Sequence, residues 1–249
     1  MSLITVILAA GKGKRMNSDL PKVLHPVLGR PMIHYVIETA RAIGSRKIIL
    51  VVGHKKELII EATKDEQVEY AVQEQQLGTG HAVMQTKPFF EDNGDNVLIL
   101  SGDVPLLTPQ TLNKMIAIQL AEQPLATLLT AVMDDPTGYG RIVRNGKGFV
   151  RQIIEHKDAT PEILKIKEIN VGIYIFQSHS LFETLPQLRN NNSQREYYLP
   201  DVIKIYVDRG EKVIALPTPD VEETHGINDI NQLKQAEIIL QKRLLKSTF

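Results

Sequence analysis

A glycine-rich, cationic segment follows the first apolar run of the chain, between Leu8 and Pro26. Its sequence is LAAGKGKRMNSDLPKVLHP, in which Gly11 and Gly13 allow the backbone to approach an anion closely. Backbone N–H groups in such a turn form a concavity for anions, and nearby cations strengthen the hydrogen bonds to phosphate. The segment therefore predicts a loop that holds a nucleoside triphosphate. The cations beside the glycines are Lys12, Lys14, Arg15 and Lys22.

Two better-known glycine loops do not fit this segment. The dinucleotide fingerprint needs a third glycine, but Met16 stands in that region, and the next apolar run, KIILVVGH, does not end in an acid that could bind a ribose. The phosphate loop of common NTPases needs Ser or Thr directly after Gly-Lys, and neither Gly-Lys pair here has one. A solvated basic turn without a ligand is the alternative interpretation of the segment taken alone.

The composition bounds the class of protein. The chain has 249 residues and equal numbers of basic and acidic side chains, 29 of each, so it lacks the overall positive charge that attracts nucleic acid. It contains no cysteine, which excludes thiol catalysis and zinc–thiolate sites. No apolar run approaches the length that spans a membrane. We expect a cytoplasmic protein that binds neither nucleic acid nor membrane.

Apolar runs alternate with helix-like segments through the first part of the chain. This alternation predicts an α/β fold with a mostly parallel, doubly wound sheet, whose ligands bind beyond the carboxyl ends of the strands. Beyond Leu125 we expect further strands that form a second wall of the cleft, and a last helix from near Asn228 with a core-packing stripe. Expected strands are 3–9, 47–53, 67–72, 96–101, 125–133, 140–144, 148–154 and 168–176. Expected helices before Leu125 are 31–43, 55–63, 79–87 and 109–121.

Polar residues follow several of these strands. Asp103 comes directly after the strand Asn96–Ser101, where a carboxylate is suited to Mg²⁺ with substrate phosphate completing the coordination; a cap on the turn before Pro105 is the alternative. Gln73 carries an amide with one acceptor and two donors, which is complementary to the N3–H and O4 edge of uracil. The glycine turn after it, Gly78–Gly80, could complete recognition of the base.

A fourth group of residues suits a sugar. Gly138 and Gly140 permit close approach of the backbone, and Glu155 and Asn170 offer hydrogen bonds to sugar hydroxyls or an acetamido group.

The separated motifs LAAGKGKRMNSDLPKVLHPVLGRPM, QLGTGHA, SGDVPLL, GYGRIVR, EHKDAT, INVGIY, EYYLPDV and HGIND occur in this order. Their combination resembles the N-terminal domain of the bacterial bifunctional N-acetylglucosamine-1-phosphate uridyltransferases, within the nucleotide-sugar pyrophosphorylases. The resemblance covers nearly the whole chain. It implies a Rossmann-like nucleotidyltransferase fold: a mostly parallel mixed central sheet flanked by helices, with a small additional β region on the sugar side of the cleft.

The resemblance also implies roles for individual residues. Nucleotide contacts are implied for Leu8, Ala9, Gly11, Lys22, Gln73, Gly78 and Thr79. Sugar contacts are implied for Gly140, Glu155, Asn170 and Tyr198. Catalytic roles are implied for Arg15, Lys22 and Asp103. The pair implied to hold the cofactor, Mg²⁺, is Asp103 and Asn228.

The reaction implied by the resemblance joins UTP and N-acetylglucosamine 1-phosphate to give UDP-N-acetylglucosamine and pyrophosphate. The chain departs from the family pattern at Lys14, Ser101, Val171 and Pro200, and the last three lie near the implied sugar side. A pyrophosphorylase for another sugar 1-phosphate or nucleotide is therefore an alternative. A catalytically weak regulatory protein that binds a nucleotide sugar is an alternative of another class.

The implied domain organisation is a single nucleotidyltransferase domain, 1–249. Its nucleotide-binding half covers about 1–124, its sugar-binding half about 125–227, and its C-terminal helix 228–246. We expect no C-terminal β-helix with acetyltransferase activity. An oligomer is possible, but not the trimer that such a β-helix assembles.

Overall fold

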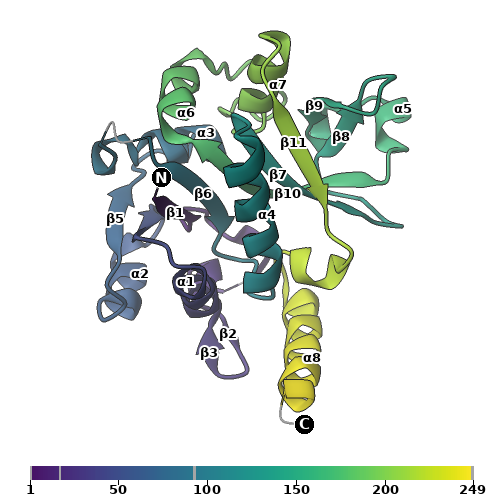
Figure 1. Cartoon of the computed structure of the whole chain (residues 1–249). Helices are drawn as coiled ribbons and strands as arrows, with labels where there is room; N and C mark the ends of the chain where they lie inside the picture. The colour runs from purple at the N-terminus through teal and green to yellow at the C-terminus, as the bar shows by residue number, and fades with distance from the viewer. Residues whose placement is uncertain (1, 17, 92–93, 248–249) are drawn as a thin grey trace.

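A mostly parallel sheet forms the centre of the computed structural model, which describes residues 2–16, 18–91 and 94–247 (Figure 1). Within these residues nine strands join in this sheet, seven of them in the order β11-β7-β10-β6-β1-β4-β5, while β8 and β9 extend it beside β10. A separate short hairpin pairs β2 with β3. The strand bounds are β1 Leu3–Leu8, β2 Pro26–Val27, β3 Arg30–Pro31, β4 Lys47–Val52, β5 Glu69–Val72, β6 Asn96–Ser101, β7 Ala126–Val132, β8 Arg141–Arg144, β9 Val150–Ile154, β10 Glu168–Gln177 and β11 Val213–Pro217.

Strand β10 runs against its neighbours. It pairs antiparallel with β6 at one end and with β7 along its length, whereas β1 pairs parallel with β4 and β6, and β11 pairs parallel with β7. Its register with β7 shifts between Asn170 and Tyr174, and Gly172 within this bulge has a φ of 82°. A β-bulge bends its strand and redirects side chains, and glycine accommodates the left-handed backbone.

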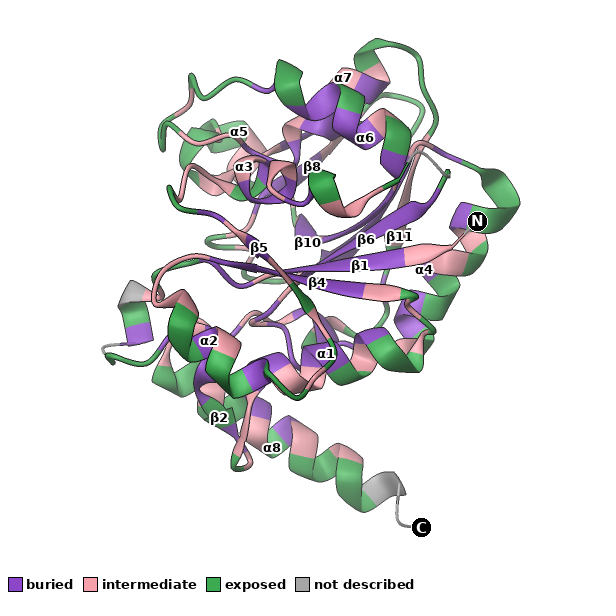
Figure 2. Cartoon of the chain, turned by 90° about the vertical axis from the view of Figure 1, so that its left-hand side faces the viewer, coloured by how far each residue is buried: buried purple, intermediate pink, exposed green. Residues whose placement is uncertain are grey.

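Helices cover both faces of the sheet, because alternate residues of the buried strands point to opposite sides. Ile4 and Val6 of β1 belong to the core cluster that contacts α3, α6 and α7, whereas Ile7 belongs to the cluster that contacts α1, α2 and α4. Figure 2 shows the buried sheet between these two layers. The helix bounds are α1 Met32–Ala42, α2 Lys56–Thr63, α3 Thr79–Met84, α4 Pro109–Glu122, α5 Pro161–Leu164, α6 Ser178–Thr184, α7 Asp201–Asp208 and α8 Ile230–Ser247.

The C-terminal helix α8 packs against a third, smaller core. This cluster contains Leu106, Ile227 and Ala236, and it includes Val27 of the β2–β3 hairpin. The outer end of α8 extends away from the sheet (Figure 1). None of the helices in the described residues is long and apolar enough to cross a bilayer.

The predicted α/β class and mostly parallel sheet are confirmed, and each expected strand and helix is present with small shifts of its ends. The helix expected to reach residue 87 ends at Met84, and a separate short 3-10 helix follows over Lys87–Phe89, with Pro88 in its first turn. The last helix begins at Ile230, because the Asp229 carboxylate accepts hydrogen bonds from the N–H groups of Asn231 and Gln232, both at 2.9 Å. Strand β11, helices α5, α6 and α7 and the β2–β3 hairpin were not predicted from the sequence.

Candidate functional site

Several loops meet at the carboxyl ends of the central strands, and backbone hydrogen bonds hold them together. Ala9 N–H donates to the Val51 carbonyl at 2.9 Å, Gly102 N–H to the Leu8 carbonyl at 3.0 Å, and Gln73 N–H to Val52 at 2.8 Å. The glycine-rich segment, the Asp103 segment and the Gln73 segment are therefore neighbours. This arrangement is the one expected for a ligand site in an open α/β sheet.

A cavity of about 260 Å³ lies between these loops. Every position to which the resemblance assigns a nucleotide contact lines it: Leu8, Ala9, Gly11, Lys22, Gln73, Gly78 and Thr79. A second cavity, of about 200 Å³, shares Gly11 and Lys22 with the first. Its other lining residues are Gly13, Arg15 and Asn228, so cationic side chains and loop backbone surround it.

A cluster of opposite charges lies where the two cavities adjoin. The Lys22 ammonium forms an ion pair with the Asp103 carboxylate and donates to Asn228 Oδ1 at 2.7 Å. Arg15 donates to the same amide oxygen from Nη2 at 2.8 Å. The Asn228 amide nitrogen donates to the Gly226 carbonyl at 3.1 Å, which turns its oxygen toward the cations. The sequence places these residues far apart, and the fold brings them together.

The donor atoms of this cluster fit a hard divalent cation. A carboxylate oxygen of Asp103 and the amide oxygen of Asn228 both contact the same ammonium group, and such oxygens are the protein ligands that Mg²⁺ takes. The Asp103 carboxylate therefore faces Lys22, whereas its main-chain carbonyl accepts from Ile227 N–H at 2.9 Å. Among the described residues, no group of three or more His, Cys, Asp or Glu side chains could hold a metal ion.

Gln73 is buried against the glycine turn that follows it. Its Nε2 donates to the Gly78 carbonyl at 3.0 Å and lies 3.0 Å from His81 Nδ1. These contacts use the amide hydrogens inside the protein, which differs from the expectation that both donor and acceptor of the amide face a base. The acceptor Oε1 is the part of this side chain suited to the N3–H of a pyrimidine.

Gly78 allows the turn to pack against a distant segment. Its φ is 106°, and a Cβ built there would lie 2.7 Å from the Tyr197 carbonyl oxygen and 2.8 Å from Glu196 Cβ. Thr79 Oγ1 accepts from Leu199 N–H at 3.1 Å. The wall of the larger cavity is thus built from two segments far apart in the sequence.

Three of the positions implied to bind sugar form a compact group. The Asn170 N–H donates to the Gly140 carbonyl at 2.8 Å, and a Cβ at Gly140 would lie 3.1 Å from Glu155 Oε1. Gly140 precedes β8, Glu155 follows β9, and Asn170 lies in β10 at the bulge. None of the three is among the residues that line the two cavities described above. Asn170 Nδ2 donates to the hydroxyl of the buried Tyr174 at 2.6 Å.

Tyr198, the fourth implied sugar position, is largely buried. Its hydroxyl accepts from Gln194 Nε2 at 2.9 Å and donates to Asp158 Oδ2 at 3.2 Å. Asp158 in turn lies close to Glu155, since its N–H donates to the Glu155 carbonyl at 3.0 Å. Tyr198 therefore contacts Asp158, and through Asp158 it is connected to the group formed by Gly140, Glu155 and Asn170.

Burial raises the pKa of Glu155 to about 7, with smaller contributions from the carboxylates of Asp201, Asp158 and Glu196. This side chain consequently changes its charge near neutrality, unlike a solvated glutamate.

Several cavity residues were not assigned from the sequence. Gln76 and Glu196 both line the larger cavity, and burial raises the pKa of Glu196. The Gln-rich run QEQQ could have indicated Gln76, whose Nε2 donates to the Gln73 carbonyl at 3.0 Å. No local pattern links Glu196 to Gly78. The remaining unassigned lining residues are Ala10, Val23, Ala82 and Ser101.

Comparisons with known proteins agree with this architecture. The chain is 49% identical over 239 residues to the bifunctional protein GlmU of Halalkalibacterium halodurans, covering 96% of this chain and 52% of that protein. It is 50% identical over 243 residues to GlmU of an Exiguobacterium species, covering 98% of this chain and 54% of that protein. The chain thus spans about half the length of the curated relatives it matches.

A crystal structure of UDP-glucose pyrophosphorylase complexed with UDP-glucose has the same fold, with a TM-score of 0.75 at 17% identity; the match covers 98% of this chain and all of that one. The model of the nucleotidyl transferase family matches residues 4–223, a region that contains both cavities except for Asn228. Since this match extends over most of the sequence, the chain belongs to the nucleotidyl transferase family.

Proposed function

We propose that this chain is a sugar-1-phosphate uridyltransferase that converts UTP and N-acetylglucosamine 1-phosphate into UDP-N-acetylglucosamine and pyrophosphate. The observation that carries the proposal is the convergence of Arg15, Lys22, Asp103 and Asn228 where two cavities adjoin. Identity of about half to the N-terminal part of GlmU proteins supports the choice of substrates.

The chemistry requires the placing of two anions that repel each other. A phosphate oxygen of the sugar phosphate attacks the α-phosphorus of UTP, and the bond from that phosphorus to the bridging oxygen of pyrophosphate breaks. Since the attacking oxygen is already anionic, no side chain has to remove a proton. The protein has to orient the reactants and stabilise the charge on the α-phosphate and the leaving group.

The two cavities suit the two parts of the nucleotide. We assign uridine to the larger cavity, with Leu8, Ala9 and Gly11 along it and Gln73, Gly78 and Thr79 at the base. The pyrophosphate then lies in the smaller cavity against Arg15 and the glycine backbone. Lys22 lines both cavities and is assigned to the α-phosphate.

The sugar is assigned to the group of Gly140, Glu155 and Asn170, with Tyr198 held behind Asp158. We therefore retain the division into a nucleotide-binding half, about 1–124, and a sugar-binding half, about 125–227. Because these substrates are intracellular metabolites, we place the reaction in the cytoplasm.

Asp103 and Asn228 are the residues that would hold Mg²⁺. Bound there, the metal would neutralise phosphate charge and act as a Lewis acid. In the free protein Lys22 contacts both of these side chains, and Arg15 contacts Asn228. Both cations can therefore turn to phosphate oxygens without crossing the cleft.

The decisive experiment measures Mg²⁺-dependent release of pyrophosphate from UTP with N-acetylglucosamine 1-phosphate. Glucose 1-phosphate, glucosamine 1-phosphate and the other nucleoside triphosphates serve as competing substrates. Strong preference for the first pair supports the proposal. Preference for another pair keeps the reaction and replaces the substrate, whereas nucleotide binding without release from any pair contradicts an enzymatic role.

A further inference from the structure

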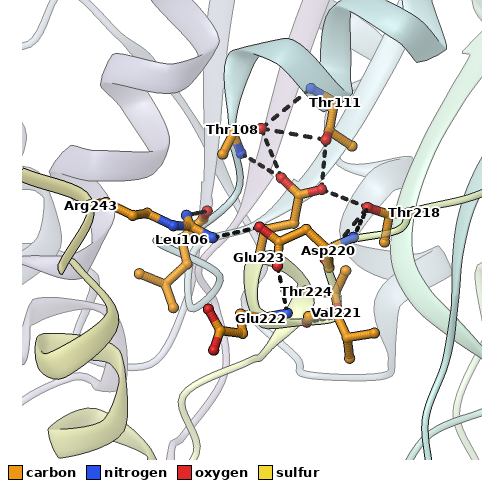
Figure 3. A network of polar contacts seen from close by, with 10 residues as sticks. All are labelled: Leu106, Thr108, Thr111, Thr218, Asp220, Val221, Glu222, Glu223, Thr224 and Arg243. Atoms are coloured by element: carbon orange, nitrogen blue, oxygen red, sulfur yellow. Dashed lines mark hydrogen bonds and ion pairs between the residues drawn. The ribbon is translucent and has the colours of Figure 1, made fainter. Parts of the chain in front are cut away.

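A buried carboxylate lies beneath the segments that carry Asp103 and Asn228. Glu223 is 1% exposed, and its two oxygens accept hydrogen bonds from three threonine hydroxyls (Figure 3). Oε1 accepts from Thr111 at 2.6 Å and Thr218 at 2.7 Å, and Oε2 accepts from Thr108 Oγ1 at 2.8 Å. The Thr108 N–H adds a longer contact to Oε2 at 3.3 Å. No ion pair to Glu223 occurs in the described part of the chain.

These contacts join three segments of the chain. Thr108 caps the N-terminus of α4, since its hydroxyl accepts from Thr111 N–H at 3.3 Å, and it follows the loop that begins with Asp103. Thr218 follows β11, and Glu223 precedes the loop that ends with Asn228. The Glu223 carboxylate thus joins the far end of the Asp103 loop to the near end of the Asn228 loop.

The same two loops are also linked closer to the site. Ile227 N–H donates to the Asp103 carbonyl at 2.9 Å, and Ile227 packs with Leu106 and Ala236 in the small core under α8. From α8, Arg243 donates to the Leu106 carbonyl at 2.5 Å and to Asp220 Oδ2 at 3.0 Å, as Figure 3 shows. Both loops are therefore fixed at each end. Glu223 is the buried carboxylate among the groups that fix them.

We propose that Glu223 is a positioning residue that sets the separation between the Asp103 carboxylate and the Asn228 amide oxygen. The inference rests on the proposed function, in which these two groups hold the divalent cation. Burying a carboxylate without an opposite charge is expensive, and apolar residues would fill the same space at lower cost. What a carboxylate adds is a set of directional hydrogen bonds to Thr108, Thr111 and Thr218. Groups bonded directly to metal ligands commonly change metal affinity by about 10–100-fold when substituted, and Glu223, which acts through the two loops, is expected at the lower end of that range.

The test compares wild type with Glu223→Gln, which keeps the shape of the side chain and removes its charge, and with Thr218→Val, which removes one hydroxyl donor far from the cavities. Binding of Mn²⁺ in the presence of UTP is measured by electron paramagnetic resonance. The Mg²⁺ concentration for half-maximal pyrophosphate release, kcat, KM for UTP and thermal unfolding are measured in parallel. We expect Mn²⁺ affinity to fall about 10-fold in Glu223→Gln and by a smaller factor in Thr218→Val.

Asp95→Asn is the matched control. Asp95 is 3% exposed, accepts from Ser2 and Arg46, and lies before β6, whereas Asp103 lies after that strand. This variant should lose stability while keeping the wild-type affinity for Mn²⁺. If all three variants lost only stability, with unchanged Mn²⁺ affinity and Mg²⁺ requirement, Glu223 would be purely structural and the proposal overturned.

The two proposals fail in different ways. Wild type that binds Mn²⁺ with UTP but releases no pyrophosphate contradicts the proposed function, and the Mn²⁺ affinities still decide the role of Glu223. A wild type that binds no Mn²⁺ under these conditions overturns the positioning role itself.

Discussion

At the scale of single residues, the candidate centre combines two cations, one carboxylate and one amide oxygen. The Lys22 ammonium contacts oxygens of both Asp103 and Asn228, and Arg15 shares the Asn228 oxygen. Residue type and position indicated the two cations and Asp103, whereas Asn228 was indicated only by the family resemblance. Their mutual contacts in the free protein could not be predicted, since they depend on three segments that meet only in the folded chain.

Asp103→Asn is expected to separate chemistry from folding. The amide keeps the size of the side chain and removes the charge that would hold Mg²⁺, so kcat should fall by roughly 100-fold or more. The side chain is 22% exposed and lies outside the three core clusters, so the midpoint of thermal unfolding should change little. Pyrophosphate release and a thermal melt provide the two readouts. Unchanged turnover would refute the metal assignment.

Lys22→Ala should depress the chemical step more than UTP binding. Loss of a cation at the α-phosphate removes an interaction that strengthens in the transition state, so kcat falls by roughly 100-fold while KM for UTP changes by a small factor. Steady-state kinetics with varied UTP measure both constants. A raised KM with unchanged kcat would limit Lys22 to substrate binding.

Glu155 makes stability depend on pH in a defined direction. Its pKa of about 7 in the folded protein exceeds that of an unfolded glutamate, near 4.3, so the folded state binds the proton more tightly. The stabilisation from this proton is complete below about pH 4 and is lost as the pH rises through 7. As the pH rises from 5 to 8, the free energy of unfolding of wild type should therefore fall by about 2 kcal/mol relative to that of Glu155→Gln.

Thermal unfolding of both chains across this pH range measures that difference. Glu168→Gln is the comparison, because hydrogen bonds from Arg144 and Thr130 lower the pKa of Glu168 despite its burial. That variant should lose stability at all pH values in the range. A pH-independent difference between wild type and Glu155→Gln would contradict the raised pKa.

At the scale of elements, the sequence predicted the regular part of the fold well. Buried strands such as β1 (LITVIL) and β6 (NVLILS) are mostly apolar runs, with Gly11 and Gly102 following within three residues of their ends, and these signals are local. Strand β11 was missed although Val213–Leu216 is a continuous apolar run, because so short a run does not by itself distinguish a strand from a helix. Glu196 was missed as a cavity residue because its position depends on the packing of Tyr197 against Gly78.

Gly78→Ala tests that packing. A Cβ there would overlap the Tyr197 carbonyl and require an unfavourable positive φ, so stability should fall by roughly 1–3 kcal/mol and KM for UTP should rise. Gly146→Ala is the matched control, because its Cβ would meet nothing within 4 Å. Equal behaviour of the two variants in thermal melts and UTP titrations would show that the turn tolerates a side chain.

At the scale of the whole molecule, α8 links the C-terminal segment to the candidate centre. Ala236 is 2% exposed and packs in the cluster that contains Leu106 and Ile227. Ala236→Glu should detach the helix from this core, lower the unfolding temperature by several degrees and reduce kcat, because Asn228 lies two residues before α8. Gln235→Glu adds the same charge at an exposed position and should leave both unchanged.

Lost stability with wild-type kcat in Ala236→Glu would show that docking of α8 is not needed to hold Asn228. A similar loss of kcat in Gln235→Glu would instead indicate an effect of the added charge. Thermal melts and pyrophosphate release distinguish these outcomes.

Strand β10 has a mechanical consequence for the whole chain. It is hydrogen-bonded to β6 near the proposed nucleotide half and to β7 and β8 near the proposed sugar half, so one continuous sheet passes beneath both. A hinge rotation of one half against the other would have to break these ladders. The sheet beneath the two proposed halves is therefore rigid. Any adjustment to substrates of different size has to occur in the loops above the sheet.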